Sequence, residues 1–426
     1  MIKVIKNKRG FALVSSVAIL IFVILFAVAY FREVNSGLAQ ATTAADTKRA
    51  YYIANAGLTD AFMQLRSYTS NPPSSFAVYD NNYPVGNKTG SYSAAVLKTN
   101  ATWPTFTITS TGTYNNVGKT LVLTVEQTAV SMSAYLSNSE IDPTYGRLWW
   151  ITGMLAVGPV HTNGQFNIYG NPVFDGPVSQ VSPAINYYAG GPPNDNPDFK
   201  QGLSLSAPSQ AVFSDSIINN ISLAASSSGG LYLSGNSTIA FKSDGTMNVT
   251  NSAKHWNKHN MALPSNKAIY VKDGSVTVSG VVNGQVTVGT NNDIFIKSHL
   301  LYNSDPRDNS SSTDLLSLVA KEDIIVTTAA PDNLEIDAVL VAVNGSFEVD
   351  RFWEDVRGDM VLYGSLINNI CGPTGIFDSS TGILYGGYNL LQYYDTRLRA
   401  LIPPWFPPTV DSNDKIVYSK VNFKEL

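Results

Sequence analysis

The sequence predicts an α+β protein with one long N-terminal helix, a small antiparallel β-sheet and a large mainly-β region folded as a right-handed parallel β-helix. Three observations lead to this prediction. A charge-free run over residues 11–31 continues into a helical pattern that ends near Arg66. Apolar and polar residues alternate between residues 92 and 128. Beyond Val130, short β-rich runs punctuated by Gly and Asn recur along the chain.

The helix is predicted over residues 11–66. No proline occurs between Met1 and Asn71, and the helical pattern ends before Pro72 and Pro73. At about 1.5 Å per residue, the apolar half spans roughly 31 Å and the whole helix roughly 80 Å. We therefore expect a transmembrane segment over residues 11–31 and an exported half beyond it. One face of the exported half is apolar and should be covered by a sheet: Tyr51, Ala54, Leu58, Phe62 and Leu65.

A small β-meander is predicted over residues 67–135. Residues 92–98, 105–112 and 119–128 alternate apolar and polar side chains, and turn residues separate them at Asn100 and at 115–118. This pattern is typical of an antiparallel sheet with one face on the core. It would form the first globular part after the helix.

Residues 136–426 are predicted to form the parallel β-helix, closed by a Pro-rich C-terminal cap. The runs place Val, Ile and Leu at alternate positions, as stacked rungs require. A β-sandwich remains an alternative, because Asn283-Gly284 and Asn344-Gly345 are hairpin signals. The runs used are 166–170, 231–235, 275–280, 285–288, 293–296, 323–326, 334–338, 346–349 and 359–364.

Composition argues against catalysis and against nucleic-acid binding. The chain carries 28 Lys plus Arg against 32 Asp plus Glu, so its net charge is −4 and it lacks the positive charge that phosphate backbones require. Cys371 is the single cysteine, and there are four histidines. His255 and His259 lack a third metal ligand, and the acidic loops 194–198 and 305–314 are interpreted as solvated turns. We expect no catalytic residues, no cofactor and no metal.

The N-terminal segment has three possible interpretations. Four cations precede the apolar run, so the N-terminus should stay cytoplasmic. Ala27-Val28-Ala29 could be a signal-peptidase site, although the run is longer than the usual apolar region of a signal peptide. A plain signal anchor is the second interpretation. The third depends on residues 8–11, in which a short basic leader ends in Gly10 directly before Phe11.

Residues 8–11 resemble a class III signal of the type IV pilin family. The resemblance implies that residues 1–10 are a leader peptide, which prepilin peptidase removes between Gly10 and Phe11, and that Phe11 is then N-methylated. Residues 50–58, Ala-Tyr-Tyr-Ile-Ala-Asn-Ala-Gly-Leu, resemble the signature of PilX-like minor pilins. Asn55 stands where that family usually has Glu, so a salt bridge there is not expected.

Ser15 is the fifth residue after the expected cleavage site. Major pilins carry Glu at this place, and the family resemblance implies that this Glu pairs with the N-terminal ammonium of a neighbouring subunit in the lipid. An ammonium buried without a carboxylate costs several kcal/mol. Ser15 therefore favours a subunit at or near a filament tip, unless it is only a lipid-tolerant residue without an assembly role.

Two further segments resemble large uncharacterised pilus-associated proteins of bacteria. They are the Gly-rich residues 158–164 with 170–178, and residues 393–398 with 403–407. In that family the first segment precedes a β-helix and the second ends it. No activity follows from this resemblance.

Together these patterns predict a minor pilin-like subunit of a type IV pilus or related secretion filament. It would be held in the inner membrane before assembly and then displayed in an extracytoplasmic filament or at the cell surface for assembly, priming or adhesion. The expected partners are other pilin subunits, the pilus assembly machinery, prepilin peptidase and membrane lipid, with a surface or carbohydrate ligand left open and nucleic acid excluded. The alternatives are a secreted or anchored carbohydrate-active β-helix enzyme and a structural cell-envelope protein.

Overall fold

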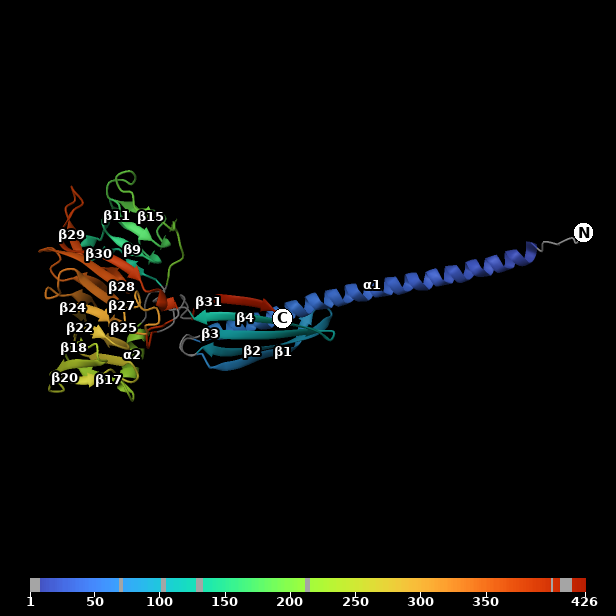
Figure 1. The fold of residues 1–426 in the computed structure, drawn as a ribbon, viewed down its shortest axis with the longest axis horizontal. Coiled ribbons are helices and arrows are strands. Elements are labelled where there is room, and N and C mark those ends of the chain that lie inside the picture. Colours follow the sequence, from blue (N-terminus) through green and yellow to red (C-terminus); the bar gives the residue numbers. More distant parts are fainter. Residues whose placement is uncertain are drawn as a thin grey trace, which may run out of the picture. The chain divides into compact units, whose positions relative to one another are not determined.

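The computed structural model describes residues 8–68, 72–100, 105–127, 133–210, 215–399, 401–406 and 416–426. The chain divides into two compact units (Figure 1). The head unit contains Met1–Ser67, Pro72–Glu126 and Lys420–Leu426, and the large unit contains Tyr68–Asn71 and Gln127–Ser419. One long helix followed by a large mainly-β region confirms the predicted α+β class.

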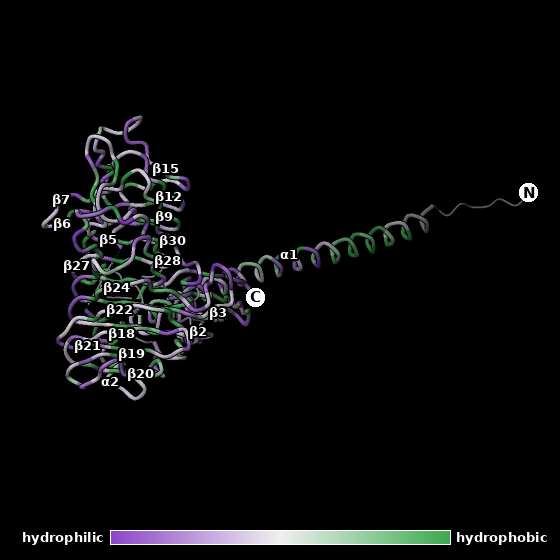
Figure 2. Tube along the Cα trace, turned by 60° about the vertical axis from the view of Figure 1, so that its left-hand side comes forward, coloured by the Kyte–Doolittle hydropathy of each residue, from purple (hydrophilic) through white to green (hydrophobic). Residues whose placement is uncertain are grey.

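Helix α1 runs from Lys8 to Ser67 and has 60 residues. It agrees with the helix predicted over residues 11–66 and begins three residues earlier. The apolar face predicted for its second half is buried at Ala54, Leu58 and Leu65. Its first half instead exposes apolar side chains, and Figure 2 shows much of that half in green, the hydrophobic colour.

The head sheet is antiparallel from β1 to β4. Its strands are β1 (Ser75–Val85), β2 (Lys88–Asn100), β3 (Thr105–Tyr114) and β4 (Val117–Gln127). The sequence predicted β2 to β4 and missed β1. The turn between β3 and β4 holds Asn115 and Asn116 at positive φ, 46° and 66°. Asn adopts this conformation more readily than most residues, and two such residues match a tight hairpin turn.

A fifth strand, β31 (Tyr418–Glu425), lies next to β4 at the edge of the head sheet. The amide of Leu426 donates to the carbonyl of Thr120 at 3.0 Å, and Lys119 Nζ lies 2.9 Å from Glu425 Oε1. The prediction that the β-helix region extends to residue 426 is therefore wrong. The large unit is inserted between two strands of one sheet, because the chain leaves the head after β4 and returns to it as β31.

Most strands of the large unit pair in parallel with other strands of this unit. The first group is β5 (Tyr135–Ser139), β6 (Ile141–Asp142), β7 (Gly146–Arg147), β8 (Trp150–Ile151), β9 (Leu155–Val157), β10 (Val160–Thr162), β11 (Asn167–Tyr169), β12 (Val173–Asp175), β13 (Val178–Gln180), β14 (Asn186–Tyr187), β15 (Asp198–Phe199) and β16 (Leu203–Ser204). The second group is α2 (Ser216–Ser226), β17 (Leu231–Ser234), β18 (Ser237–Phe241), β19 (Thr246–Asn251), β20 (Trp256–Ala262), β21 (Ala268–Lys272), β22 (Val276–Val282), β23 (Gln285–Thr290) and β24 (Ile294–Tyr302). The third is β25 (Leu315–Ala320), β26 (Ile324–Val326), β27 (Leu334–Val349), β28 (Val356–Cys371), β29 (Gly375–Phe377), β30 (Leu384–Tyr394) and the 3₁₀ turn η2 (Thr396–Arg399).

The stacking order of these strands differs from their order in the chain. One parallel ladder runs β16, β13, β10, β5, β28, β27, β25, β23, β21, β17. A second runs β15, β12, β9, β30, β28, β27, β24, β22. The first strand of the unit, β5, thus lies in the middle of the stack. Figure 1 shows the green strands beside the orange and red ones, with the yellow strands at the other end of the unit.

Neither Asn-Gly pair that suggested a sandwich forms a hairpin. Asn283-Gly284 connects β22 to β23, and these two strands pair in parallel with other strands on successive levels of the ladders. Asn344-Gly345 lies inside β27 where the register with β28 shifts. Antiparallel pairs within the large unit join β18, β19 and β20, β29 with β30, and β6 with β7.

The core of the large unit is a continuous apolar column between the ladders. Ile, Val and Leu fill much of it, at alternate positions in strands such as β18, β19 and β26, which is the pattern that predicted stacked strands. Helix α2 adds Ile217, Ile218 and Ile221, all buried, against β17, β21 and β23. The predicted Pro-rich cap is placed differently. The strand β9 pairs with β30, and the segment 401–406 instead contacts Asn266, just before β21, and Thr287 in β23.

Candidate functional site

The first half of α1 is an exposed apolar surface. An 18-residue window of this helix has a mean hydropathy of 2.8, so its length and composition are sufficient to cross a membrane, as would also be true of a signal sequence. Each large apolar side chain left in water forgoes about 1.5–3 kcal/mol compared with burial. A covering of lipid or of neighbouring helices is therefore strongly favoured. The exposed side chains are Leu13, Val14, Val17, Ile19, Leu20, Ile21, Phe22, Val23, Ile24, Leu25, Phe26, Val28, Tyr30 and Phe31.

The residues predicted to direct processing and assembly lie at the start of this surface. Gly10 and Phe11 belong to the first turns of α1, and their side-chain surroundings lie outside the described residues. Ser15 follows one turn later and is partly exposed. The cleavage at Gly10 and the assembly role of Ser15 stay predictions.

The second half of α1 lies close against β2 and β3, and small residues permit this contact. A Cβ atom on Gly112 would lie 2.2 Å from the backbone nitrogen of Ala54 and 2.5 Å from the carbonyl oxygen of Ala50. On the helix, a Cβ on Gly57 would lie 2.5 Å from the ring of Tyr92. Residues 50–58 thus contain small residues at which helix and sheet approach closely.

Polar contacts fix the register of the helix on the sheet. The buried hydroxyl of Ser110 donates to the carbonyl of Ala54 at 2.7 Å. The hydroxyl of Tyr92 donates to Asp60 at 2.9 Å, and burial, followed by this hydrogen bond, raises the pKa of Tyr92 to about 12. Near the other end of the contact, Asn115 donates to Asp46 at 3.1 Å. These contacts come from β2, from β3 and from the turn between β3 and β4, so the helix has one preferred position.

The two Gly-rich segments that resemble pilus-associated proteins stack on each other in the large unit. Gly158 adopts φ of 120°, a conformation that favours glycine. A Cβ atom on Gly176 would lie 2.0 Å from the carbonyl oxygen of Gly158, and a Cβ on Gly158 would lie 2.5 Å from the Cβ of Tyr394. The segments 158–164, 170–178 and 393–398 therefore meet at one corner of the stack, and their glycines allow the levels to approach.

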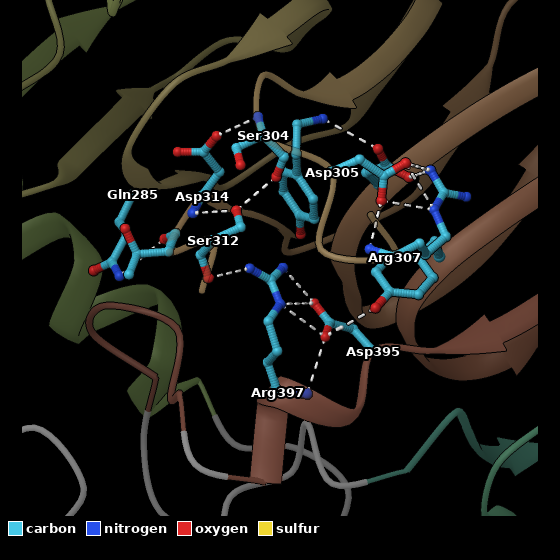
Figure 3. Close-up of polar contacts among 12 residues, drawn as sticks. Gln285, Ser304, Asp305, Arg307, Ser312, Asp314, Asp395 and Arg397 are labelled. Carbon is cyan, nitrogen blue, oxygen red and sulfur yellow. Dashed lines mark hydrogen bonds and ion pairs between the residues drawn. The ribbon is translucent and has the colours of Figure 1, made fainter. Parts of the chain in front are cut away.

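A buried ion pair fixes the chain where it leaves β30 (Figure 3). Arg397 Nη2 lies 2.6 Å from Asp395 Oδ2, and Arg397 Nε lies 3.0 Å from Oδ1 of the same carboxylate. Arg397 also donates to the carbonyl of Ser312 at 2.8 Å and stacks over the ring of Tyr302. Tyr363 donates to Asp395 at 3.3 Å. We call these five residues the exit clasp; it ties the turn after β30 to the loop between β24 and β25.

Arg307 gathers three carboxylates beside the exit clasp. Its Nη2 atom lies 2.7 Å from Asp305, 2.6 Å from Glu335 and 3.5 Å from Asp337. Asp337 is 1% exposed, and the amide of Tyr302 donates to its Oδ2 at 3.1 Å. This amide and Arg307 both lower the pKa of Asp337, but burial has a larger and opposite effect. Burial therefore raises the pKa of Asp337 to about 7.

We expect the stability of the large unit to fall as the pH rises from about 4 to about 7, and Asp337→Asn to weaken this dependence. Between these values Asp337 keeps its proton in the folded protein but has released it in the unfolded chain. The stability that this proton gives is fully present below the pKa of Asp337 in the unfolded chain, and it is lost as the pH rises through the pKa of Asp337 in the folded protein. The effect is on the order of 2–4 kcal/mol. Thermal unfolding of both proteins at pH 5, 6, 7 and 8 measures it. Parallel curves for the two proteins would contradict the expectation.

His161 is a buried residue that contacts two polar side chains. It is 2% exposed, its Nδ1 lies 2.8 Å from Ser179 Oγ, and its Nε2 lies 3.0 Å from Asn163 Oδ1. Burial lowers the pKa of His161. His255 lies in a turn and His259 in β20, so they do not share a helix face. Among the described residues, no group of three or more His, Cys, Asp and Glu could hold a metal ion.

The comparisons with known proteins are limited in extent. Residues 103–182 match the model of a family described as a domain of unknown function, DUF4900. This match joins the end of the head sheet to the first strands of the large unit, including the Gly-rich segments. No curated protein matches the chain. Among solved structures, the crystal structure of the competence-associated pilin ComZ from Thermus thermophilus is similar over 89% of this chain and 97% of that chain, at 13% identity and a TM-score of 0.34. A similarity of this size is too weak to support a functional argument, so the proposal below rests on the chain's own residues.

Proposed function

We propose that the chain is a minor pilin-like subunit of a type IV pilus or related secretion filament, and that its role is assembly and display without catalysis. One observation supports this most directly. A single helix combines an exposed apolar half with a half that is held against an antiparallel sheet by small residues. The apolar half could anchor the subunit in the inner membrane before assembly and could pack with other pilin helices afterwards.

The same proposal assigns the display role to the large unit. Its parallel ladders support a right-handed parallel β-helix, in which each turn of chain buries its apolar residues on the next. In the filament this unit would be carried to the extracytoplasmic side or the cell surface. Ser15 in place of Glu favours a position at or near the tip, where no subunit ahead requires a carboxylate.

The processing site provides the test. Expressed in a bacterium that has a prepilin peptidase, the mature protein should begin at Phe11 and carry the mass of one added methyl group. Gly10→Val should retain the leader, because a branched side chain next to the scissile bond obstructs the approach of the protease to the backbone. N-terminal sequencing and intact mass measure both results.

A matched control is Gly37→Val, a second helix glycine with no atom within 4 Å of an added Cβ. This variant should be processed like the unmodified protein. A mature protein beginning at Tyr30 would indicate signal peptidase, and an intact Met1 would indicate a plain anchor. Either result would overturn the pilin-like assignment.

A further inference from the structure

A cavity of about 260 Å³ opens into the large unit where β5 stacks on β28. Its buried end contains Tyr135, Leu366 and Leu390, which come from β5, β28 and β30. The more exposed lining comes from Tyr145, from residues 147–149 and from residues 375–377. At this level the chain leaves the parallel ladder after Cys371 and forms β29, which pairs antiparallel with β30. The departure of the chain from the stack explains why a cavity exists here.

The walls of the cavity are aromatic and already in place. The ring of Trp150 lies 5.2 Å from that of Tyr135 and 5.0 Å from that of Phe174, and the rings of Tyr145 and Phe352 lie 5.0 Å apart. Two of these pairs meet edge to face, the arrangement that aromatic rings favour. Each ring is therefore held by a neighbour, and a ligand would not need to order the walls when it binds.

The rim does not favour an anion. Arg147 is the single charged residue among those that line the cavity, and it is exposed. Burial, followed by the carboxylates of Glu348, Asp142 and Asp350, raises the pKa of Tyr145. Three carboxylates thus act on Tyr145 at this rim, whereas the one guanidinium is exposed to solvent.

The titratable groups that line the buried end of the cavity, Tyr135 and Cys371, are uncharged at neutral pH. Burial raises the pKa of Tyr135 and of Cys371 well above their usual values, so both groups stay protonated. Behind them, Glu140 is 1% exposed and accepts a hydrogen bond from the Tyr135 hydroxyl at 3.0 Å. Burial also raises the pKa of Glu140. A charged group on a ligand would find no opposite charge at this end and would lose its hydration.

We propose that this cavity binds a small neutral bicyclic aromatic molecule of the indole or naphthalene class. Flat rings suit walls made of aromatic faces and edges. An apolar protein cavity of about 150 Å³ holds benzene, so the larger cavity has room for two fused rings. The proposal concerns the large unit alone and does not depend on the pilin-like assignment.

The experiment uses the full-length protein in detergent and 6-fluoroindole as the probe, observed by fluorine NMR. The probe should show saturable line broadening. Leu384→Trp should weaken its binding at least tenfold, because Leu384 lines the cavity and an indole side chain there would occupy it. The matched control is Ile383→Trp, at a neighbouring residue that is 67% exposed and lies outside the cavity lining. It should bind the probe like the unmodified protein.

A second measurement on the unmodified protein remains informative even if Leu384→Trp fails to fold. With methyl-labelled methionine, 6-fluoroindole should shift the resonance of Met154, which lines the cavity, and leave that of Met261 in β20 unchanged. Fluorinated indole-3-acetate, an anion with the same rings, should bind at least tenfold more weakly. Unchanged binding in folded Leu384→Trp, an unshifted Met154 or tighter binding of the anion would each overturn the proposal.

Discussion

Arg397→Ala should lower the free energy of unfolding of the large unit by about 3–5 kcal/mol. Asp395 is fully buried, and Arg397 contacts its carboxylate through two nitrogens. Without the guanidinium, Asp395 would be left as a buried charge without its cation, which is the most expensive way to disrupt such a pair. The variant would also lose the donor to the Ser312 carbonyl, so the loop between β24 and β25 should loosen.

Urea unfolding followed by tryptophan fluorescence measures this loss. The large unit contains five of the six tryptophans, so the signal reports mainly on it. Arg399→Ala is the matched control, because Arg399 is exposed and its guanidinium lies 5.9 Å from the centre of the Tyr394 ring. It should cost less than about 1 kcal/mol. A loss below 1 kcal/mol in Arg397→Ala would show that water reaches Asp395 and that the exit clasp does not stabilise the fold.

Gly112→Val should destabilise the head unit by about 3 kcal/mol. The new Cβ would lie 2.2 Å from the backbone nitrogen of Ala54, and a backbone atom in a helix cannot rotate away as a side chain can. The helix would have to move off the sheet and would lose the hydrogen bond between Ser110 and Ala54. The preference of valine for strands offsets at most about 1 kcal/mol of this loss.

Hydrogen exchange of peptides from α1 and β3, read by mass spectrometry, measures the effect. Amides from residues 46–67 and 105–114 should exchange faster in Gly112→Val. Gly118→Val in β4 is the control, because a Cβ there meets only the Thr113 methyl at 3.9 Å. Equal exchange in the two variants would contradict the close contact between helix and sheet.

The local elements of this fold are largely predictable from the sequence, whereas the partners of each strand are not. The helix and three head strands carry regular periodicities, which report on local structure. The strand β31 lacks such a regular alternation, and nothing local indicates that it pairs with β4 after almost three hundred intervening residues. The same limit applies to β5, because alternation shows which side chains point inward and does not show which strand lies above or below.

The candidate sites also divide into features with a local sequence pattern and features that depend on distant residues. The apolar half of α1 is a continuous run, so the sequence alone showed that it is long and apolar enough to cross a membrane. Residues 393–398 were singled out by resemblance, yet the role of Asp395 and Arg397 depends on Ser312 and Tyr302, which are distant in the chain. The cavity was missed because its lining comes from several separate segments, none of which has a pattern of its own. A cluster of Trp149, Trp150 and Tyr145 was its only local signal.

The position of β5 in the middle of the stack determines the order in which the large unit can fold. Tyr135 pairs with Leu366, 231 residues later (366 minus 135), and β9 likewise depends on β30. Contacts so distant in the chain slow folding, because a long loop must close before they form. As the chain is synthesised from its N-terminus, β5 to β16 come first and keep an open sheet edge until β28 and β30 arrive. Completion of the stack therefore waits for nearly the whole chain, and this edge is the part of the nascent protein most exposed to pairing with another copy.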